Sequence, residues 1–386
     1  MWVKNAIQIP MKTDDAKATV KQLPKNIKNN GLSEKERYLG LIKKKIQYVH
    51  PHHLPQFYNH TPIVYHLMQD LQKQLDDALS TLALKKKLLP PEHLDLATTY
   101  GNIAGIYQII GNLQKSLTYV LKTIAIQEKA LPPDHPDLAI SYYNIAIVYI
   151  SMGDLQKSLD YGLKAIAIRE KVLSPDHPNL AASYGNIAAI YRTMGDYQKS
   201  LDYGLKELAI FEKISAPDHL NLATPYNNIA ETYRLMGDYQ KSLDYGLKSI
   251  AIRKKAFSPE HLKLAIAYAN IALTYEAMGD LQKSLNYGLK AMTIREKALP
   301  PKHPELAISY NNIALTYYRL YKWEEAFSFG QKALSIFLKV LPFGHFNTKN
   351  AVNTMATMLQ DATEVNGKEW AEPYQKWFDE NCKAYL

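Results

Sequence analysis

Histidine recurs through this sequence at a fixed interval that raises the question of a metal site. Imidazole is a common zinc ligand, but all ligands of one zinc ion must lie about 2 Å from it. Units stacked in an array lie about 8 to 10 Å apart, so side chains that occur once per unit cannot converge on one ion. We therefore expect no metal site, and we predict a local capping or solvent-facing role. The 42-residue interval gives His93, His135, His177, His219, His261, His303 and His345.

Motifs for catalysis and cofactor binding do not occur in the sequence. It contains no Walker-type Gly-Lys-Ser/Thr loop, no His-Glu-x-x-His pair and no strand-borne glycine fingerprint. The single cysteine, Cys382, is a poor candidate nucleophile and excludes an intramolecular disulfide. We predict no enzymatic activity, no catalytic residue and no cofactor. Because the chain begins without the apolar segment of a secretory signal and has no apolar run long enough to span a membrane, we expect a reducing, cytoplasmic location without membrane insertion.

The polar residue best suited to binding chemistry is an asparagine that occupies one position in six consecutive units. An amide both donates and accepts hydrogen bonds, so a row of amides can hold the backbone of an extended peptide whatever its side chains. An equally open interpretation is that these amides bond neighbouring helices and keep the units in register. The six residues are Asn102, Asn144, Asn186, Asn228, Asn270 and Asn312.

Each unit predicts two helices that could position such an asparagine. Apolar and aromatic residues recur at helical spacing on both sides of Gly153-Asp154, where the glycine favours a left-handed turn and the aspartate an N-cap. A proline-containing stretch, 174–178, ends the second helix and offers Asp176 as the next N-cap, with Pro178 in the following first turn. We expect the recurrent tyrosines to belong to the core, with their hydroxyl groups bonded at its edge.

This pattern resembles the tetratricopeptide repeat. The residues that carry the resemblance in one unit are Tyr142, Ile145, Ala146, Tyr149, Gly153, Ser158, Tyr161 and Ala165. The 42-residue period, the Asn-Ile-Ala string and the Pro-Asp-His-Pro string are similar to the long repeats of kinesin light chains. The resemblance implies an all-α, right-handed superhelical solenoid of antiparallel helix pairs. It also implies that the first helices line a concave groove and that the six asparagines contact a peptide there.

The period divides the chain into a central array with atypical ends. We predict six full repeats over residues 93–344, a degenerate N-terminal capping repeat over 47–92 and a degenerate C-terminal capping repeat over 345–386. Residues 1–46 form a basic leader, partly disordered or helical, with eleven of the 46 Lys and Arg and four of the 37 Asp and Glu. The remaining 35 basic and 33 acidic residues leave the array nearly neutral, which argues for protein partners rather than nucleic acid.

Variable positions beside the asparagines should set the ligand specificity. Arg192, Arg234 and Arg319 are candidates for pairing with a ligand carboxylate, and Tyr318 lies on the same predicted face. The sequence therefore predicts a non-enzymatic scaffold that binds a peptide or a partner helix, and leaves the oligomeric state open. Two alternatives are a regulatory solenoid that senses a peptide, and RNA or acidic-surface binding through the basic leader.

One junction departs from the repeat pattern. Glu207 stands where other units have alanine, and Pro225 replaces a small residue in the next first helix. Because proline inside a helix is unfavourable by about 3 kcal/mol, we expect this helix to start late, near Thr224, with Pro225 in its first turn. We also expect a locally widened seam in which Glu207 is solvated, although a tolerated irregularity without function would explain the same residues.

Overall fold

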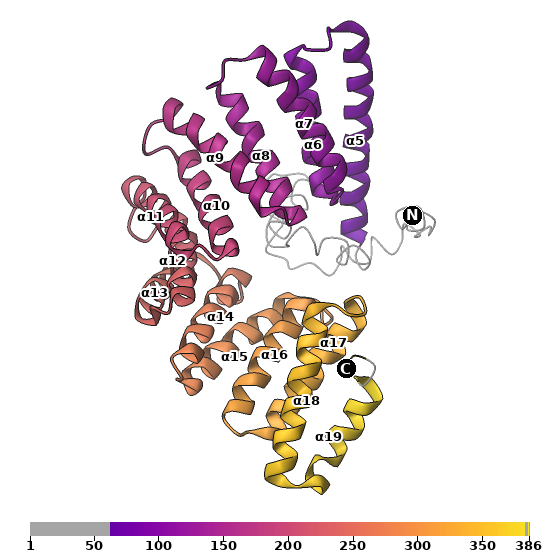
Figure 1. Cartoon of the computed structure of the whole chain (residues 1–386), viewed down its shortest axis with the longest axis vertical. Coiled ribbons are helices and arrows are strands. Elements are labelled where there is room, and N and C mark those ends of the chain that lie inside the picture. Colours follow the sequence, from indigo (N-terminus) through magenta and orange to yellow (C-terminus); the bar gives the residue numbers. More distant parts are fainter. Residues whose placement is uncertain (1–61, 383–384, 386) are drawn as a thin grey trace, which may run out of the picture. The chain divides into compact units, whose positions relative to one another are not determined.

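The computed structural model describes residues 62–382 and Tyr385, and these residues are almost entirely helical, with no strand among them (Figure 1). The basic leader predicted over residues 1–46 lies outside this part of the chain. By its internal contacts the chain divides into two units, Met1–Tyr161 and Gly162–Leu386. The division falls within helix α9 (Leu155–Val172), and each unit is considered by itself.

The first unit contains helices that contact one another in sequence order. Helix α5 contacts α6, which pairs with α7, and α7 contacts α8. The predicted helix pairs of the repeats are therefore present. The N-terminal capping repeat predicted over 47–92 lies partly outside the described residues, and α5 falls in its described part. The helices are α5 (Pro62–Leu88), α6 (Leu94–Ile110), α7 (Leu113–Ala130), α8 (Pro136–Met152) and the start of α9.

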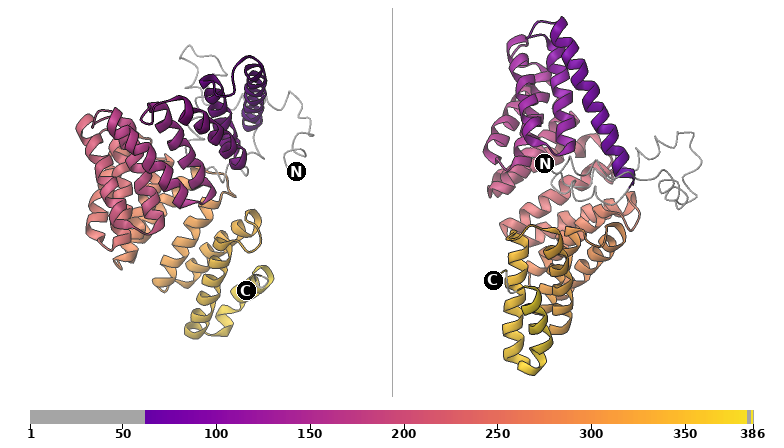
Figure 2. Two further views of the ribbon diagram at one scale, coloured as in Figure 1. Left: turned by 45° about the horizontal axis from the view of Figure 1, so that its top comes forward. Right: turned by 90° about the vertical axis from the view of Figure 1, so that its right-hand side faces the viewer.

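The second unit continues with the same paired arrangement (Figure 2). First helices of successive repeats also touch directly, since α10 contacts α12, α12 contacts α14, and α16 contacts α18. The first helices thus share one face, which we call the first-helix face. The elements are α10 (Pro178–Met194), α11 (Tyr197–Ile214), η3 (Leu220–Leu222), α12 (Ala223–Met236), α13 (Tyr239–Ala256), α14 (Leu262–Ala277), α15 (Leu281–Ala298), α16 (Pro304–Arg319), α17 (Trp323–Val340), α18 (Phe346–Asn366) and α19 (Lys368–Asn381).

The turn inside a repeat has the predicted geometry in the first five full repeats, whereas the sixth has Tyr321, with a φ of 58°, and Lys322 at these positions. Gly153 ends α8 with a φ of 83°, in the left-handed region that glycine adopts without steric cost. Asp154 then caps α9, because its carboxylate accepts a hydrogen bond from the backbone N–H of Lys157 at 3.1 Å. The same pair of devices recurs in the next repeat at Gly195 and Asp196.

The turn between repeats is capped by histidine, and the prediction of Asp176 as N-cap is wrong. Helix α10 begins at Pro178, so His177 occupies the capping position, and its Nδ1 accepts from the N–H of Asn179 at 3.0 Å. Asp176 instead forms an ion pair with Lys213 at 2.8 Å. The local capping role predicted for the histidines is confirmed, because all seven residues of the 42-residue series accept in this way.

Tyrosines fill the core between the two helices of a repeat, as predicted. In one repeat the ring of Tyr161 lies 5.8 Å from that of Tyr149 and 5.9 Å from that of Tyr142. The Tyr142 hydroxyl donates to Glu128 at the core edge, and this bond together with burial raises the pKa of Tyr142. Small residues let the helices approach, since the Ser158 hydroxyl donates to the backbone carbonyl of Ala146 at 2.8 Å.

The fourth repeat departs from the others as its sequence predicts, with one exception. A 3-10 turn occupies Leu220–Leu222, and α12 begins only at Ala223, with Pro225 in its first turn. The late start of this helix is confirmed. The prediction that Glu207 is solvated is wrong, because only 7% of its surface is exposed. Its side chain is covered by neighbouring helices, which a widened seam would have left open.

The C-terminal repeat is covered by a last helix. Met355 and Leu359 of α18 are buried, and α19 supplies Phe378 to the same apolar cluster. Cys382 is also fully buried there, and burial raises the pKa of its thiol to about 11. No helix among the described residues combines the length and the apolar character that crossing a membrane requires.

The histidine caps predict a measurable stability difference. Replacing His177 by alanine removes an N-cap acceptor and should lower the free energy of unfolding by about 1 kcal/mol. His177→Asn should retain most of the stability that the cap contributes, because asparagine is itself a strong N-cap. Urea unfolding followed by circular dichroism would measure both. Asp176→Ala is the matched control, and a loss there as large as in His177→Ala would contradict the assignment of the cap.

Candidate functional site

The six predicted asparagines lie at equivalent points of the first helices. Asn102 and Asn144, in the first unit, are exposed. In the second unit the residues are half-buried; they are Asn186, Asn228, Asn270 and Asn312. The sequence thus predicted correctly that each of the six is on the first helix of its repeat.

One of these amides bonds a neighbouring repeat, and the others do not. The Asn270 Nδ2 donates to the side-chain oxygen of Asn227 at 3.2 Å, linking α14 to α12. Within the described part of the chain, the remaining five side-chain amides of the ladder make no hydrogen bond to the protein. The register-holding interpretation therefore accounts for Asn270 and leaves the others without an internal role.

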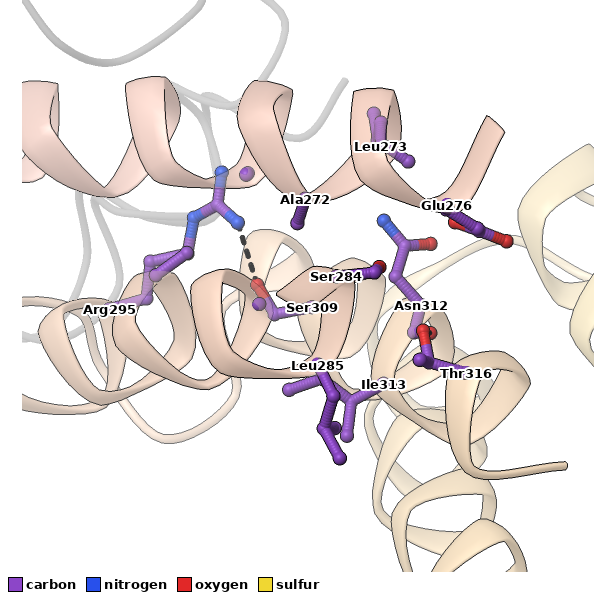
Figure 3. Close-up of a pocket in the computed structure, with 13 residues that line it drawn as sticks. Ala272, Leu273, Glu276, Ser284, Leu285, Arg295, Ser309, Asn312, Ile313 and Thr316 are labelled. Atoms are coloured by element: carbon purple, nitrogen blue, oxygen red, sulfur yellow. Dashed lines mark hydrogen bonds between the residues drawn. The ribbon is translucent and has the colours of Figure 1, made fainter. Parts of the chain in front are cut away.

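A small cavity shows which side chains surround such an amide (Figure 3). It has a volume of about 30 Å³ and lies between α14, α15 and α16. The Asn312 amide points toward α14, near Ala272 and Glu276, with Thr316 beside it. On the α15 side, Arg295 Nη1 donates to the Ser309 hydroxyl at 2.7 Å and closes one end of the cavity. The first-helix face is thus indented between successive repeats.

The arginines predicted to meet a ligand carboxylate differ in their partners. Arg234 binds Glu231 on the same helix through two hydrogen bonds of 2.7 and 3.1 Å. Arg319 pairs with Glu276 of the preceding repeat at 2.8 Å. Arg192 donates only to the backbone carbonyl of Asn228, at 3.4 Å. Of the three, Arg192 is therefore the one without a carboxylate in ion-pair distance among the described residues.

Charges along this face are more balanced than the arginines alone suggest. Burial lowers the pKa of Arg192, while the carboxylate of Glu231 raises it and Arg234 lowers it. Tyr318, the remaining predicted residue, donates its hydroxyl to Asp361 of α18. The Glu231–Arg234 pair could be found from its spacing of three on one helix. The Arg319–Glu276 and Tyr318–Asp361 pairs each join residues 43 apart, so only the stacking of adjacent repeats reveals them.

Glu207 was predicted to be solvated, but the structure buries it. It lies on α11 against Gly185 of α10, where a Cβ atom added to the glycine would stand 2.5 Å from its Oε1. Its Oε2 is shielded from solvent and has no hydrogen-bond partner. Burial raises the pKa of this carboxyl from 4.5 to about 7. The signal in the sequence was a carboxylate where other repeats have Ala, Ser or Thr.

The sequence profile of the tetratricopeptide repeat matches five overlapping segments of the chain, 95–171, 137–213, 179–255, 221–297 and 263–339. The chain belongs to the tetratricopeptide repeat family. The resemblance found in the sequence is confirmed, and the helix pairs described above are the repeats of this family. A comparison with curated protein sequences gives no match.

Solved structures with the same arrangement share little sequence with this chain. A kinesin light chain protein with nearly identical repeats from Podosopora anserina is 24% identical over 53% of this chain and 98% of its own, with a TM-score of 0.47. RapI in its apo form is 15% identical over 74% and 97%, with a TM-score of 0.56. The apo quorum sensor NprR from B. thuringiensis is 15% identical over 90% and 92%, with a TM-score of 0.55. The similarities to RapI and NprR establish the fold.

The polar side chains of the described repeats show no clustering of potential metal ligands. Among the described residues, no three or more His, Cys, Asp or Glu side chains gather closely enough to hold a metal ion. The capping histidines direct Nδ1 at their own helices. Within the described part of the chain, the first-helix face presents side-chain amides without a hydrogen-bond partner and one arginine, Arg192, without a carboxylate in ion-pair distance.

The burial of Glu207 predicts a pH-dependent stability. Because its pKa is higher in the folded chain, folding takes up a proton between about pH 4.5 and 7, so its contribution to stability falls as the pH rises through that range. Glu207→Gln removes this titration. The free energy of unfolding of the native chain minus that of the variant should therefore be lower at pH 8 than at pH 4 by about 3 kcal/mol.

Urea unfolding at the two pH values would measure this difference. Asp202→Asn is the matched control, because Asp202 lies on the same helix with an exposed side chain. For that variant the difference from the native chain should be nearly the same at both pH values. If Glu207→Gln behaves like the control, Glu207 is not buried in solution.

Proposed function

We propose that this protein is a non-enzymatic scaffold whose first-helix face forms a groove for an extended peptide or a partner helix. The observation that carries the proposal is the row of side-chain amides that make no hydrogen bond to the part of the chain that the structure describes. In the second unit three of them, Asn186, Asn228 and Asn312, are half-buried. A half-buried amide without a partner is unfavourable unless water or a ligand bonds it. These amides are therefore better suited to a ligand than to the stability of the array.

The spacing of the amides fits a backbone ligand. Repeats stack about 10 Å apart, and an extended chain advances about 3.3 Å per residue, so successive amides would meet a peptide about every third residue. From Asn186 to Asn312 there are three such steps, which correspond to about nine residues of peptide. An amide can donate to a peptide carbonyl and accept from a peptide N–H at each step, which gives affinity without fixing the sequence.

Charged residues of the same face would add selectivity. Arg192 is the best placed to receive a ligand carboxylate, because it has no acidic partner of its own. Arg234 and Arg319 could bind a carboxylate only by exchanging Glu231 and Glu276 for it, and Tyr318 would have to leave Asp361. We propose these three as secondary contacts.

Relatives with this fold support the proposal only at the level of architecture. NprR is a quorum sensor, and a sensing role for this chain would use the same groove. We propose protein or peptide partners, because the array is nearly neutral. We also propose that the protein meets them in the cytoplasm. Binding of RNA or acidic surfaces through residues 1–46 stays a prediction, since that segment lies outside the described residues.

Substitution of the uncommitted amides tests the groove. We expect a variant with Asn186, Asn228 and Asn312 all changed to alanine to fold normally and to lose most of its binding to an array of random ten-residue peptides. At about 1 kcal/mol for each lost hydrogen bond, three losses correspond to a fall of about 100-fold in affinity. Fluorescence anisotropy with the peptides selected by the native chain would measure it.

Two controls separate a binding role from a structural one. Asn286→Ala removes an exposed amide from the second helix α15 and should leave peptide binding unchanged. Asn270→Ala breaks the bond to Asn227 and should lower stability more than any other single change in the ladder. If the triple variant binds like the native chain, the groove proposal is wrong. If it unfolds, the amides serve the structure instead.

A further inference from the structure

The most unusual polar group of the second unit is the carboxylate of Glu207. The residue is 93% buried, and its Oε2 has neither solvent nor a hydrogen-bond partner. Among the described residues it has no ion pair, and burial is the sole cause of its raised pKa. A buried carboxylate without a partner destabilises a fold. The neighbouring repeats show that the fold does not require one at this point.

Equivalent positions in other repeats are either apolar or satisfied. The hydroxyl of Thr123 donates to the carbonyl of Ala97 at 3.2 Å, and that of Ser249 donates to the carbonyl of Ala223 at 2.7 Å. The remaining equivalents are alanines, namely Ala165, Ala291 and Ala333. Glu207 is therefore the one member of this series whose polar group is left unbonded among the described repeats.

The residues beneath Glu207 cannot supply the missing partner. Two repeats later, the corresponding space holds Arg295 and Ser309, which bond each other. At the seam between repeats three and four, Phe211 and Pro225 occupy these two positions. Phe211 packs against an apolar cluster, and Pro225 is buried. Neither side chain can donate a hydrogen bond. A partner for Glu207 must therefore come from another direction.

The direction that remains is toward α10, one of the first helices. The carboxylate lies over Gly185 of α10, which has no side chain to cover it, and Oε1 occupies the space that a side chain there would enter. The equivalents of Gly185, Glu207 and Asn228 two repeats later are Ala269, Ala291 and Asn312, which together line the cavity in Figure 3. At the seam between repeats three and four, Glu207 therefore stands at the position equivalent to the cavity-lining Ala291, in the same interface as Asn228. Arg192 of the same face is directed at the Asn228 carbonyl and does not pair with it.

We propose that Glu207 is the recognition site for a basic side chain, lysine or arginine, of the peptide bound in the groove. The inference rests on the proposed function and adds the chemistry of the ligand. An ammonium or guanidinium group entering past Gly185 would donate to the unpaired carboxylate in a site of low dielectric, where a charge-assisted hydrogen bond is strong. Neutral donors would leave the negative charge of Glu207 uncompensated. The seam between repeats three and four would thus fix the register of a ligand that the amides hold without sequence preference.

A double-mutant cycle on the full chain tests this site. The probe is an array of random ten-residue peptides, and the native chain should select peptides enriched in lysine or arginine. One selected peptide is then compared with its version in which the basic residue is glutamine. Glu207→Gln should lower the affinity for the basic peptide tenfold or more and the affinity for the glutamine version little, because only the basic peptide loses a charged partner. Gly185→Ala should weaken the basic peptide too, since its methyl group collides with the carboxylate.

Asp202→Asn is the matched control, because it removes one negative charge from an exposed position of the same helix. It should leave the preference for basic peptides intact. If the selected peptides lack lysine and arginine, or if Glu207→Gln weakens both versions equally, the site assignment is wrong while the groove proposal stands. If no peptide binds the native chain, both proposals fail. Circular dichroism of each variant shows that lost binding does not reflect unfolding.

Discussion

Each helix pair of this protein has apolar surfaces on two sides, and it can bury them only against the pairs before and after it. This stacking constraint explains why the same small and aromatic residues return every 42 positions. Ser158 and Ala146 show how closely the helices must approach, since a side-chain hydroxyl of one reaches a backbone carbonyl of the other. The tyrosine stacks fill the remaining space, and glutamates at the edge of the core bond several of their hydroxyl groups.

Stacking leaves the first-helix face free to vary. A residue such as Ile187 is completely buried in the repeat core, whereas the preceding Asn186 is half-buried and its amide makes no hydrogen bond to the described residues. Because residues of the core and residues of the first-helix face alternate along one helix, the same short segment specifies both the periodic fold and the surface for a ligand. The turn geometry fixed by Gly195 and the cap fixed by His177 then set where this segment starts and ends.

Local signals in the sequence predicted the fold, and packing between repeats decided what they did not. The glycine turns, the Asp154 cap and the late start of the fourth repeat follow from backbone preferences of single residues. His177, and not Asp176, is the N-cap of α10 because it directly precedes Pro178, and the sequence prediction was wrong by one position. Glu207 was misjudged for another reason: its burial depends on how α10, α11 and α12 pack together, and no local pattern contains that information.

A stacked array can tolerate an unfavourable group because the cost stays local. Each repeat contacts its neighbours alone, so the buried carboxylate of Glu207 weakens one seam without affecting the caps or the cores elsewhere. The late helix start at Pro225 lies at the same seam, where three residues of α-helix are replaced by a 3-10 turn. A ligand that supplied a cation there would offset the cost at the point where it arises. Binding and local stability would then be coupled at this seam and independent of the rest of the array.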